Sequence, residues 1–243
     1  MPTDPTDPTD RQPEPEPGGS PKRFDDVGGY EREIGQLVPG HGLMRAVAIS
    51  AVQAHLAREG RALGRLLVVG VGPGSELEAL VEAFPSAQIE VFETSERMAR
   101  AAAAGLVGTA ADRVQVHHRA LEVGEAADFD VAVCLLVAHL VPVGRAREAF
   151  WQALGSALRP GGVLALSEIS VMGDRERDSW LRWSRGAGVE GDRLEQLDVR
   201  LQGGFPLLDL DRTRALARGA GLEWLCTPVQ ILGVGLHLWR RAP

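Results

Sequence analysis

Residues 67–76 read Leu-Val-Val-Gly-Val-Gly-Pro-Gly-Ser-Glu, an apolar run that ends in three closely spaced glycines. The run begins at Leu66 and continues to Val71, which is typical of a strand that is buried on both faces. The next segment, residues 75–84, has the apolar spacing of a helix. Glycine permits a positive φ in the intervening turn and lets a ligand approach the backbone closely. The stretch therefore predicts a strand, a ligand-binding turn and a helix.

The alternation of strand, turn and helix continues along the chain. Beyond the first strand, the pattern predicts parallel strands at 88–93, 114–118, 128–137 and 163–170, with helices at 75–84, 96–106, 145–158 and 211–220. Apolar strands that alternate with amphipathic helices indicate a parallel sheet covered on both faces. Two last strands, 222–226 and 231–239, have only a short connection and should pair antiparallel. We therefore expect an α/β fold, a Rossmann-like doubly wound seven-stranded sheet with an antiparallel C-terminal strand pair.

The segments around this sheet predict the domain organisation. Residues 1–23 contain three Pro-Thr-Asp repeats and seven of the 15 prolines, and no hydrophobic residue follows Met1 before Phe24. Such a segment cannot bury enough apolar surface to order itself, so we expect a disordered tail. Residues 24–243 should form one domain. Its two elaborations would be a helical cap at 24–60, with helices 30–37 and 41–58, and a polar, Arg-rich, helical lid insertion at 172–206.

Composition and charge narrow the classes of function. The 243 residues carry a net charge of −7, and 25 of the 26 basic residues are Arg. An acidic balance disfavours nucleic-acid binding, which needs clustered positive charge. No apolar run reaches membrane-spanning length and no secretory signal is present, so we expect a cytoplasmic protein without membrane contact. Cys134 and Cys226 sit in apolar runs and should be buried free thiols. No residue cluster has metal-ligand spacing, so no metal is expected.

An acidic residue completes a candidate nucleoside site. Glu93 ends the second predicted strand, 19 residues after Gly74, and its carboxylate there can accept hydrogen bonds from two ribose hydroxyls. The glycine spacing is one residue shorter than in the dinucleotide fingerprint, and Glu76 would bring negative charge near a pyrophosphate. The pattern therefore favours a nucleoside cofactor without phosphate over a nicotinamide dinucleotide. A surface Glu beside a plain glycine turn is the simpler alternative.

Four segments together resemble the class I S-adenosylmethionine (SAM)-dependent methyltransferases. They are residues 68–75, 89–95, 128–133 and 158–168, the last with the pattern Leu-x-Pro-Gly-Gly-x-Leu-x-x-x-Glu. The resemblance implies SAM as cofactor, S-adenosylhomocysteine (SAH) as product, and methyl transfer to O, N or C of a small-molecule substrate.

Two flanking segments extend the resemblance to a subgroup. Residues 24–41 and 204–223 are similar to the carboxy-SAM synthase and its tRNA-uridine-modification methyltransferase relatives. A carboxy-SAM-type or tRNA-modification enzyme, and a SAM-binding protein without catalysis, therefore stay as alternatives. The position of the carboxylate-binding Arg of carboxy-SAM synthases is taken by Asp198, with Arg200 two residues on. Since an Asp would repel that carboxylate, ordinary SAM is favoured as the cofactor.

A homodimer is kept as an alternative to a monomeric assembly.

The resemblance also implies which residues contact the cofactor: His41, Gly70, Val71, Gly72, Gly74, Glu93, Thr94, Arg119, Ala120 and Cys134. Arg119 stands where the family usually has an acid for the adenine amino group, so the backbone of Ala120 is an alternative donor or acceptor. Cys134 reads equally well as a small hydrophobe in a buried strand. His41, where relatives have a Tyr over the cofactor, reads also as a plain helix-start residue.

Catalytic and substrate residues are less defined. His139, just after the fourth strand, is the candidate general base, and a packing role is the alternative. Trp180 and Trp183 lie three residues apart on one helical face. They form either an aromatic wall for the substrate or, as we favour, an anchor for the insertion. Of the other histidines, we interpret His117 and His118 as strand-end residues, and His55 and His237 as structural.

Overall fold

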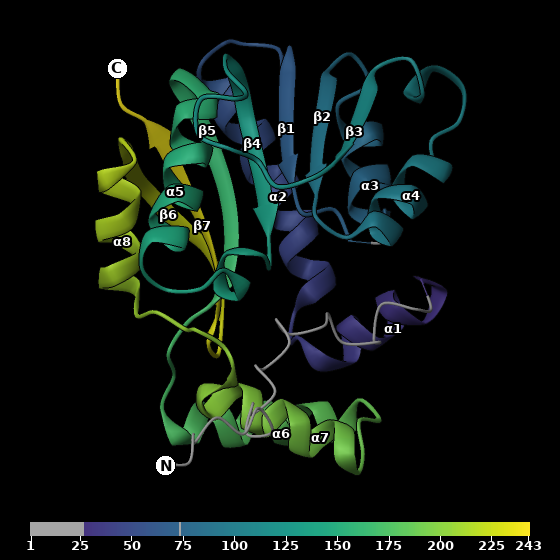
Figure 1. Ribbon diagram of the computed structural model, residues 1–243, viewed down its shortest axis with the longest axis vertical. Coiled ribbons are helices and arrows are strands. Elements are labelled where there is room, and N and C mark those ends of the chain that lie inside the picture. The colour runs from purple at the N-terminus through teal and green to yellow at the C-terminus, as the bar shows by residue number, and fades with distance from the viewer. Residues whose placement is uncertain (1–26, 73) are drawn as a thin grey trace, which may run out of the picture.

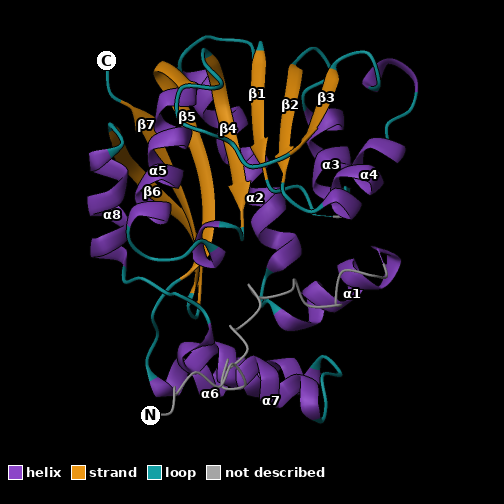
Figure 2. Cartoon of the chain, viewed as in Figure 1, coloured by secondary structure: helices purple, strands orange, loops and turns teal. Residues whose placement is uncertain are grey.

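The computed structural model describes residues 27–72 and 74–243, so the predicted tail lies outside the described residues. Seven strands form one sheet in the order β3-β2-β1-β4-β5-β7-β6 (Figure 2). Their bounds are β1 Arg65–Val69, β2 Gln88–Glu93, β3 Val114–His118, β4 Phe129–Leu135, β5 Leu158–Ile169, β6 Leu222–Ile231 and β7 Val234–Arg241. The first five strands are parallel, and β7 runs antiparallel between β5 and β6. The expected Rossmann-like architecture with its antiparallel C-terminal pair is confirmed.

Eight α-helices surround the sheet in the described part of the chain. They are α1 Val27–Leu37, α2 His41–Arg58, α3 Ser75–Ala83, α4 Glu96–Ala104, α5 Arg145–Ala157, α6 Asp174–Gly186, α7 Asp192–Val199 and α8 Leu210–Gly219. Short 3-10 turns cover Gly108–Ala110 and Ala138–Leu140, and a π turn covers Arg200–Gly204. The helical insertion expected at 172–206 contains two α-helices, α6 and α7, because Gly188 and Gly191 between them have positive φ values of 94° and 55°.

The central strands are buried on both faces because successive side chains alternate between two apolar layers. Leu66 and Val68 of β1 pack into one layer with α2 and α3, whereas Leu67 and Val69 pack into the other with α5 and α8. Burial of such side chains contributes roughly 1.5–3 kcal/mol each. This two-sided core fixes the sheet, so its carboxyl edge is a rigid platform for the loops that follow the strands.

The remaining helices lie at that carboxyl edge. Figure 1 shows α1, α6 and α7 below the ends of the parallel strands, at the side from which the glycine turn emerges. In open α/β sheets, ligands bind outside the carboxyl ends of the strands. The chain between β5 and α8 and the N-terminal helices therefore cover the place where a ligand is expected.

Two details at the sheet edge differ from expectation. β6 runs to Ile231, five residues beyond the predicted end, although it contains polar residues and Pro228. It is the edge strand, where one face meets solvent and a proline does not break the ladder. For the same reason Cys226 is exposed, so its predicted burial is wrong, whereas Cys134 is buried as expected.

Candidate active site

The glycine turn after β1 has the geometry that the sequence predicts. Gly70 and Gly72 have φ values of 74° and 54°, which L side chains rarely adopt. A Cβ on Gly70 would lie 2.3 Å from Cγ2 of Val137, so this position has no room for any side chain. The Gly70 N–H donates to the carbonyl of Phe92 at 2.8 Å and joins the turn to the end of β2.

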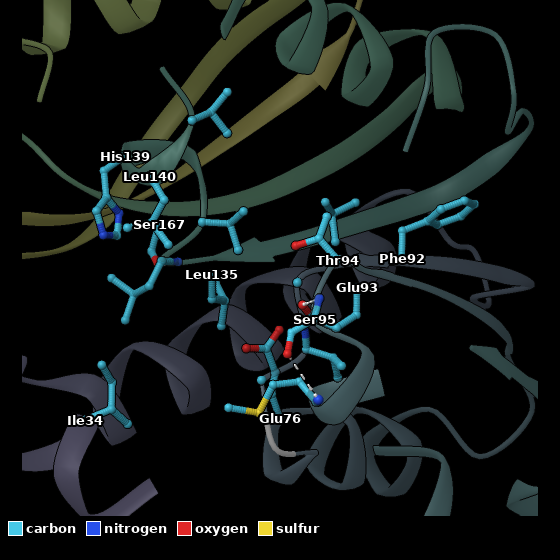
Figure 3. A pocket seen from close by; sticks show the side chains of 18 of the residues that line it. Ile34, Glu76, Phe92, Glu93, Thr94, Ser95, Leu135, His139, Leu140 and Ser167 are labelled. Carbon is cyan, nitrogen blue, oxygen red and sulfur yellow. Dashed lines mark hydrogen bonds between the residues drawn. The ribbon is translucent and has the colours of Figure 1, made fainter. Parts of the chain in front are cut away.

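Glu93 lies beside this turn with its carboxylate fixed by the backbone. Its Oε2 accepts from the Val71 N–H at 3.0 Å and its Oε1 accepts from the Ser95 N–H at 2.8 Å (Figure 3). The residue is only 8% exposed, so these two bonds also compensate its desolvation. Each carboxylate oxygen can accept a further hydrogen bond. Glu93 is therefore a preoriented acceptor pair at the end of β2.

A cavity of about 1320 Å³ opens at this edge of the sheet. Typical small-molecule sites measure roughly 300–1,000 Å³, so the space accommodates a cofactor together with a second molecule. Figure 3 shows a polar side with Glu76, Glu93, Thr94 and Ser95, and a separate side with Leu140, His139 and Ser167. The apolar lining comes from the covering helices as well as the sheet, with Ile34, Leu37, Leu136, Leu140, Trp180 and Phe205 among its members.

Seven of the predicted cofactor residues line this cavity: His41, Gly70, Val71, Gly72, Glu93, Thr94 and Ala120. They come from the start of α2 and from the loops after β1, β2 and β3. Segments far apart in the sequence thus meet at one place, as parallel strands require.

The other three predicted cofactor residues have structural surroundings. Gly74 faces α4, where a Cβ would lie 3.1 Å from Cα of Ala102. Arg119 is paired with Glu125 and lies 5.1 Å above the ring of Phe92. Cys134 is fully buried in the apolar layer with α5 and α8. None of these three residues lines the cavity.

Trp180 and Trp183 have different surroundings in the structure. Trp180 is fully buried, lines the cavity, and its Nε1–H donates to the carbonyl of Leu37 at 2.7 Å. It therefore connects α6 to the end of α1, as an anchor would, and also forms part of the wall. Trp183 is 38% exposed and does not line the cavity.

His139 lines the cavity from the turn after β4 and is 4% exposed. Its ring contacts Phe205 edge-on at 5.3 Å, and its Nδ1 has no hydrogen-bond partner in the described part of the chain. Burial, with a smaller contribution from the charge of Arg147, lowers the pKa of His139 to about 3. The ring is therefore neutral at physiological pH, but it is a weak base.

Several cavity residues were not identified from the sequence. Tyr30 of α1 covers the glycine turn, with its ring 3.8 Å from the position of a Cβ on Gly72. Its pKa is raised, first by burial and then by the charges of Glu93, Glu33 and Glu76. His118, interpreted as a strand-end residue, lines the cavity with its Nε2 3.2 Å from the carbonyl oxygen of Thr94. These positions depend on how α1 and β3 pack, and no local pattern in the sequence indicates them.

Glu76, the second residue of α3, lines the cavity with a buried Oε1 that has no hydrogen-bond partner among the described residues. Burial raises the pKa of Glu76 to about 8, against the lowering effect of Arg45 and with a small raising effect of Glu93. The sequence showed this residue only as an acid at a helix N-terminus.

The described residues contain neither a metal-binding cluster nor a membrane-spanning helix. Over 27–72 and 74–243, no group of three or more His, Cys, Asp and Glu side chains is arranged to hold a metal ion. Over the same ranges, no helix has both the length and the hydropathy to span a membrane.

Residues 67–164 match the family model of a methyltransferase domain. No curated protein matched the chain. Among solved structures, N-methyltransferase NodS from Bradyrhizobium japonicum WM9, in complex with SAH, is 15% identical with a TM-score of 0.51. That alignment covers 80% of this chain and 86% of NodS.

Two further solved structures have higher TM-scores. The plantazolicin methyltransferase BpumL in complex with SAH is 15% identical over 90% of this chain and 92% of its own, with a TM-score of 0.64. The CurJ carbon methyltransferase has the same identity, TM-score and coverage of this chain, which spans 59% of the CurJ chain. The protein thus has the class I methyltransferase fold, and its central segment matches a methyltransferase domain. These findings support a SAM-dependent methyltransferase.

Proposed function

We propose that the cavity binds SAM and that the protein transfers the methyl group to an O, N or C atom of a small, largely apolar molecule. The observation that carries this proposal is the position of Glu93. Its carboxylate is held by two backbone N–H groups at the end of β2, directly beside a turn in which Gly70 and Gly72 have positive φ values. Such an acceptor pair suits the two hydroxyls of a ribose.

The residues present fit an adenosyl cofactor. Glu93 would hold the ribose hydroxyls, Gly70 and Gly72 would allow close approach of the methionine part, and Thr94, His118 and Ala120 would border the base. A dinucleotide fits poorly, because the glycine spacing of the turn is one residue shorter than in the dinucleotide fingerprint. SAM supplies an activated methyl group, so the chain has mainly to orient the two molecules and exclude water.

The acceptor would occupy the apolar part of the cavity under α1, α6 and α7. Ile34, Leu37 and Trp180 contribute to that wall. His139 borders it as a neutral imidazole, and we propose that it orients the acceptor by a hydrogen bond. With a pKa near 3 it contributes little as a general base, so the acceptor atom should be nucleophilic without strong base assistance.

Calorimetric titration of SAM, SAH and NAD into the purified protein tests the cofactor. We expect micromolar binding of the two adenosyl ligands and none of NAD. Glu93→Gln should weaken SAH binding at least tenfold, because the amide cannot accept from both hydroxyls. Glu82→Gln, an exposed charge removal on α3, is the matched control and should bind as the wild type does. Binding of NAD, or of neither adenosyl ligand, would contradict the proposal.

A carboxy-SAM-type function is the second candidate, since Arg200 from the insertion lines the cavity. Asp198, the residue expected to repel an additional carboxylate, instead approaches Arg177, with Oδ1 3.4 Å from Nε, and does not line the cavity. If this candidate is right, carboxy-SAM binds more tightly than SAM, and Arg200→Gln removes the preference. Equal or weaker binding of carboxy-SAM would exclude it.

A SAM-binding protein without catalysis is the remaining alternative. Incubation with SAM and a panel of small apolar acceptors, followed by detection of SAH, separates it from an enzyme, because only methyl transfer depends on the acceptor. We also propose that the protein is a cytoplasmic enzyme and that its substrate is a small molecule. The net charge of −7 argues against tRNA as the acceptor.

A further inference from the structure

Glu76 is a partly buried residue whose Oε1 is fully buried, and no cation in the described part of the chain forms an ion pair with it. It follows the glycine turn directly, it lines the cavity, and its Oε1 has no hydrogen-bond partner among the described residues. An unpartnered buried acceptor is unfavourable unless the group binds a ligand or keeps its proton. The position of Glu76 therefore requires an explanation that the core does not provide.

The groups that act on Glu76 come from four elements. Arg45 of α2 attracts it, but the Nη1 of Arg45 donates to the Ser75 hydroxyl at 2.9 Å. Glu93 of β2 repels Glu76. Glu76 also interacts electrostatically with Tyr30 of α1 and with the buried thiol of Cys134 on β4. Burial has the largest effect on the pKa of Glu76, and it favours the protonated form of this carboxyl group.

Apart from the exposed Glu122, the other acidic side chains at the cavity have different surroundings. Glu93 accepts two backbone hydrogen bonds, and Glu33 is paired with Arg193 at 2.9 Å. Glu96 is paired with Arg100 on the same helix. Glu76 is thus the one of these four with an oxygen that is both buried and unpartnered.

Resting on the proposed function, we propose that Glu76 binds a positively charged group of the cofactor and releases its carboxyl proton to solvent as that group arrives. SAM has two such groups, the α-ammonium and the sulfonium, and SAH retains only the first. One proton passes from the Glu76 carboxyl to the buffer, and the charge of the ligand does not change. Glu76 would then position the cofactor rather than take part in methyl transfer.

This coupling has a defined direction with pH. Below about pH 8 the carboxyl must lose its proton before it can pair with the cation, so the affinity rises as the pH rises. The ratio of wild-type to Glu76→Gln affinity should increase by about tenfold per pH unit up to that point and then level off. The ratio is used because the ligand's own α-amino group titrates at roughly pH 7.7–8.0 and affects both proteins equally.

Calorimetry at pH 6.5 in phosphate and in imidazole buffer measures the protons released, because the two buffers differ in ionisation enthalpy. We expect close to one proton per bound SAM for the wild type and for Glu82→Gln, and none for Glu76→Gln, whose fold is checked by its circular dichroism. Methylthioadenosine carries neither cationic group and should bind without proton release. Release with both SAM and SAH identifies the ammonium as the partner, and release with SAM alone identifies the sulfonium.

Two results would overturn the inference, and they are distinguishable. If SAM and SAH bind the wild type without proton release and Glu76→Gln binds them equally well, Glu76 has no role in the site and the proposed function stands. If the folded wild type binds neither ligand, the proposed function itself fails, and this inference fails with it.

Discussion

At the scale of single residues, two carboxylates in the same cavity have opposite environments. Glu93 accepts N–H groups from Val71 and Ser95, whereas Glu76 has a buried oxygen without a partner. Burial of the second carboxyl favours its protonated form and raises the pKa of Glu76 to about 8. In the absence of ligand, Glu76 should therefore reduce the stability of the fold as the pH rises.

Replacement of Glu76 by Gln should stabilise the protein without ligand. The folded-state pKa of about 8 lies above the usual 4.5, so the folded state binds the proton more tightly than the unfolded state. The wild type then loses stability as the pH rises from about 4.5 to 8, and Glu76→Gln does not. Urea denaturation should show the advantage of the variant growing by about 1–3 kcal/mol between pH 5.5 and 8.5. A stability difference between Glu76→Gln and the wild type that does not change with pH would contradict this account. The control variant Glu82→Gln should show the same pH dependence of stability as the wild type.

The residue scale also shows what a sequence can reveal about a site. Gly70, Gly72 and Glu93 were predictable because a turn and a strand end are local features, and the parallel sheet fixes their relation. Tyr30 and Glu76 were not, because covering the glycine turn and burial without a partner depend on the packing of α1 and α2. Cys134 illustrates the reverse: its place in the strand was predictable, but the alternation along β4 directs its side chain into the core.

At the scale of elements, the connection between α1 and α6 completes the cavity. Trp180 of α6 donates to the Leu37 carbonyl at the end of α1, and both residues line the cavity. Since α1 also carries Tyr30 above the glycine turn, loosening this connection should affect ligand binding as well as stability.

Trp180→Phe should cost about 1–2 kcal/mol of unfolding free energy, because it leaves a buried carbonyl without its donor and a small void. The affinity for SAH should fall severalfold in the same variant. Trp183→Phe, on the same helix but 38% exposed, should stay within about 0.5 kcal/mol of the wild type. Urea denaturation and SAH titration of both variants measure this difference. Equal effects of the two substitutions would show that Trp180 has no special connecting role.

The bounds of a strand could be predicted from the sequence where all of its side chains are buried. The parallel strands were found because both faces are apolar, whereas β6 was cut short because its edge position alternates exposed and buried residues and admits Pro228. The strand β5 begins at Leu158, before the Pro160-Gly161-Gly162 segment that reads as a turn. Pairing with a neighbour, which a local pattern does not contain, decides both boundaries.

At the scale of the whole molecule, the cavity lies between the sheet and the helices that cover its carboxyl edge. Its floor is the carboxyl edge of a sheet buried on both faces, and its cover consists of α1, the start of α2, α6 and α7 (Figure 1). The floor contributes to both apolar layers, whereas the cover contributes only to the layer with α2 and α3, through residues such as Trp180 and Leu197. A ligand that touches both should act as a cross-link between them.

Binding of SAH should therefore stabilise the whole fold and protect the cover most. At a concentration of 100 Kd the linkage stabilises the native state by about 2.7 kcal/mol, which for a chain of this size raises Tm by roughly 5–10 °C. Hydrogen exchange should slow at residues 30–45, at residues 176–200 and at the glycine turn, and the amides of β5 and β7 should slow to the extent that they exchange by global unfolding. Glu93→Gln should reduce both effects at the same SAH concentration. Protection confined to the glycine turn would mean that the ligand does not touch the covering helices, and the acceptor would then have to enter a cavity that stays open during methyl transfer.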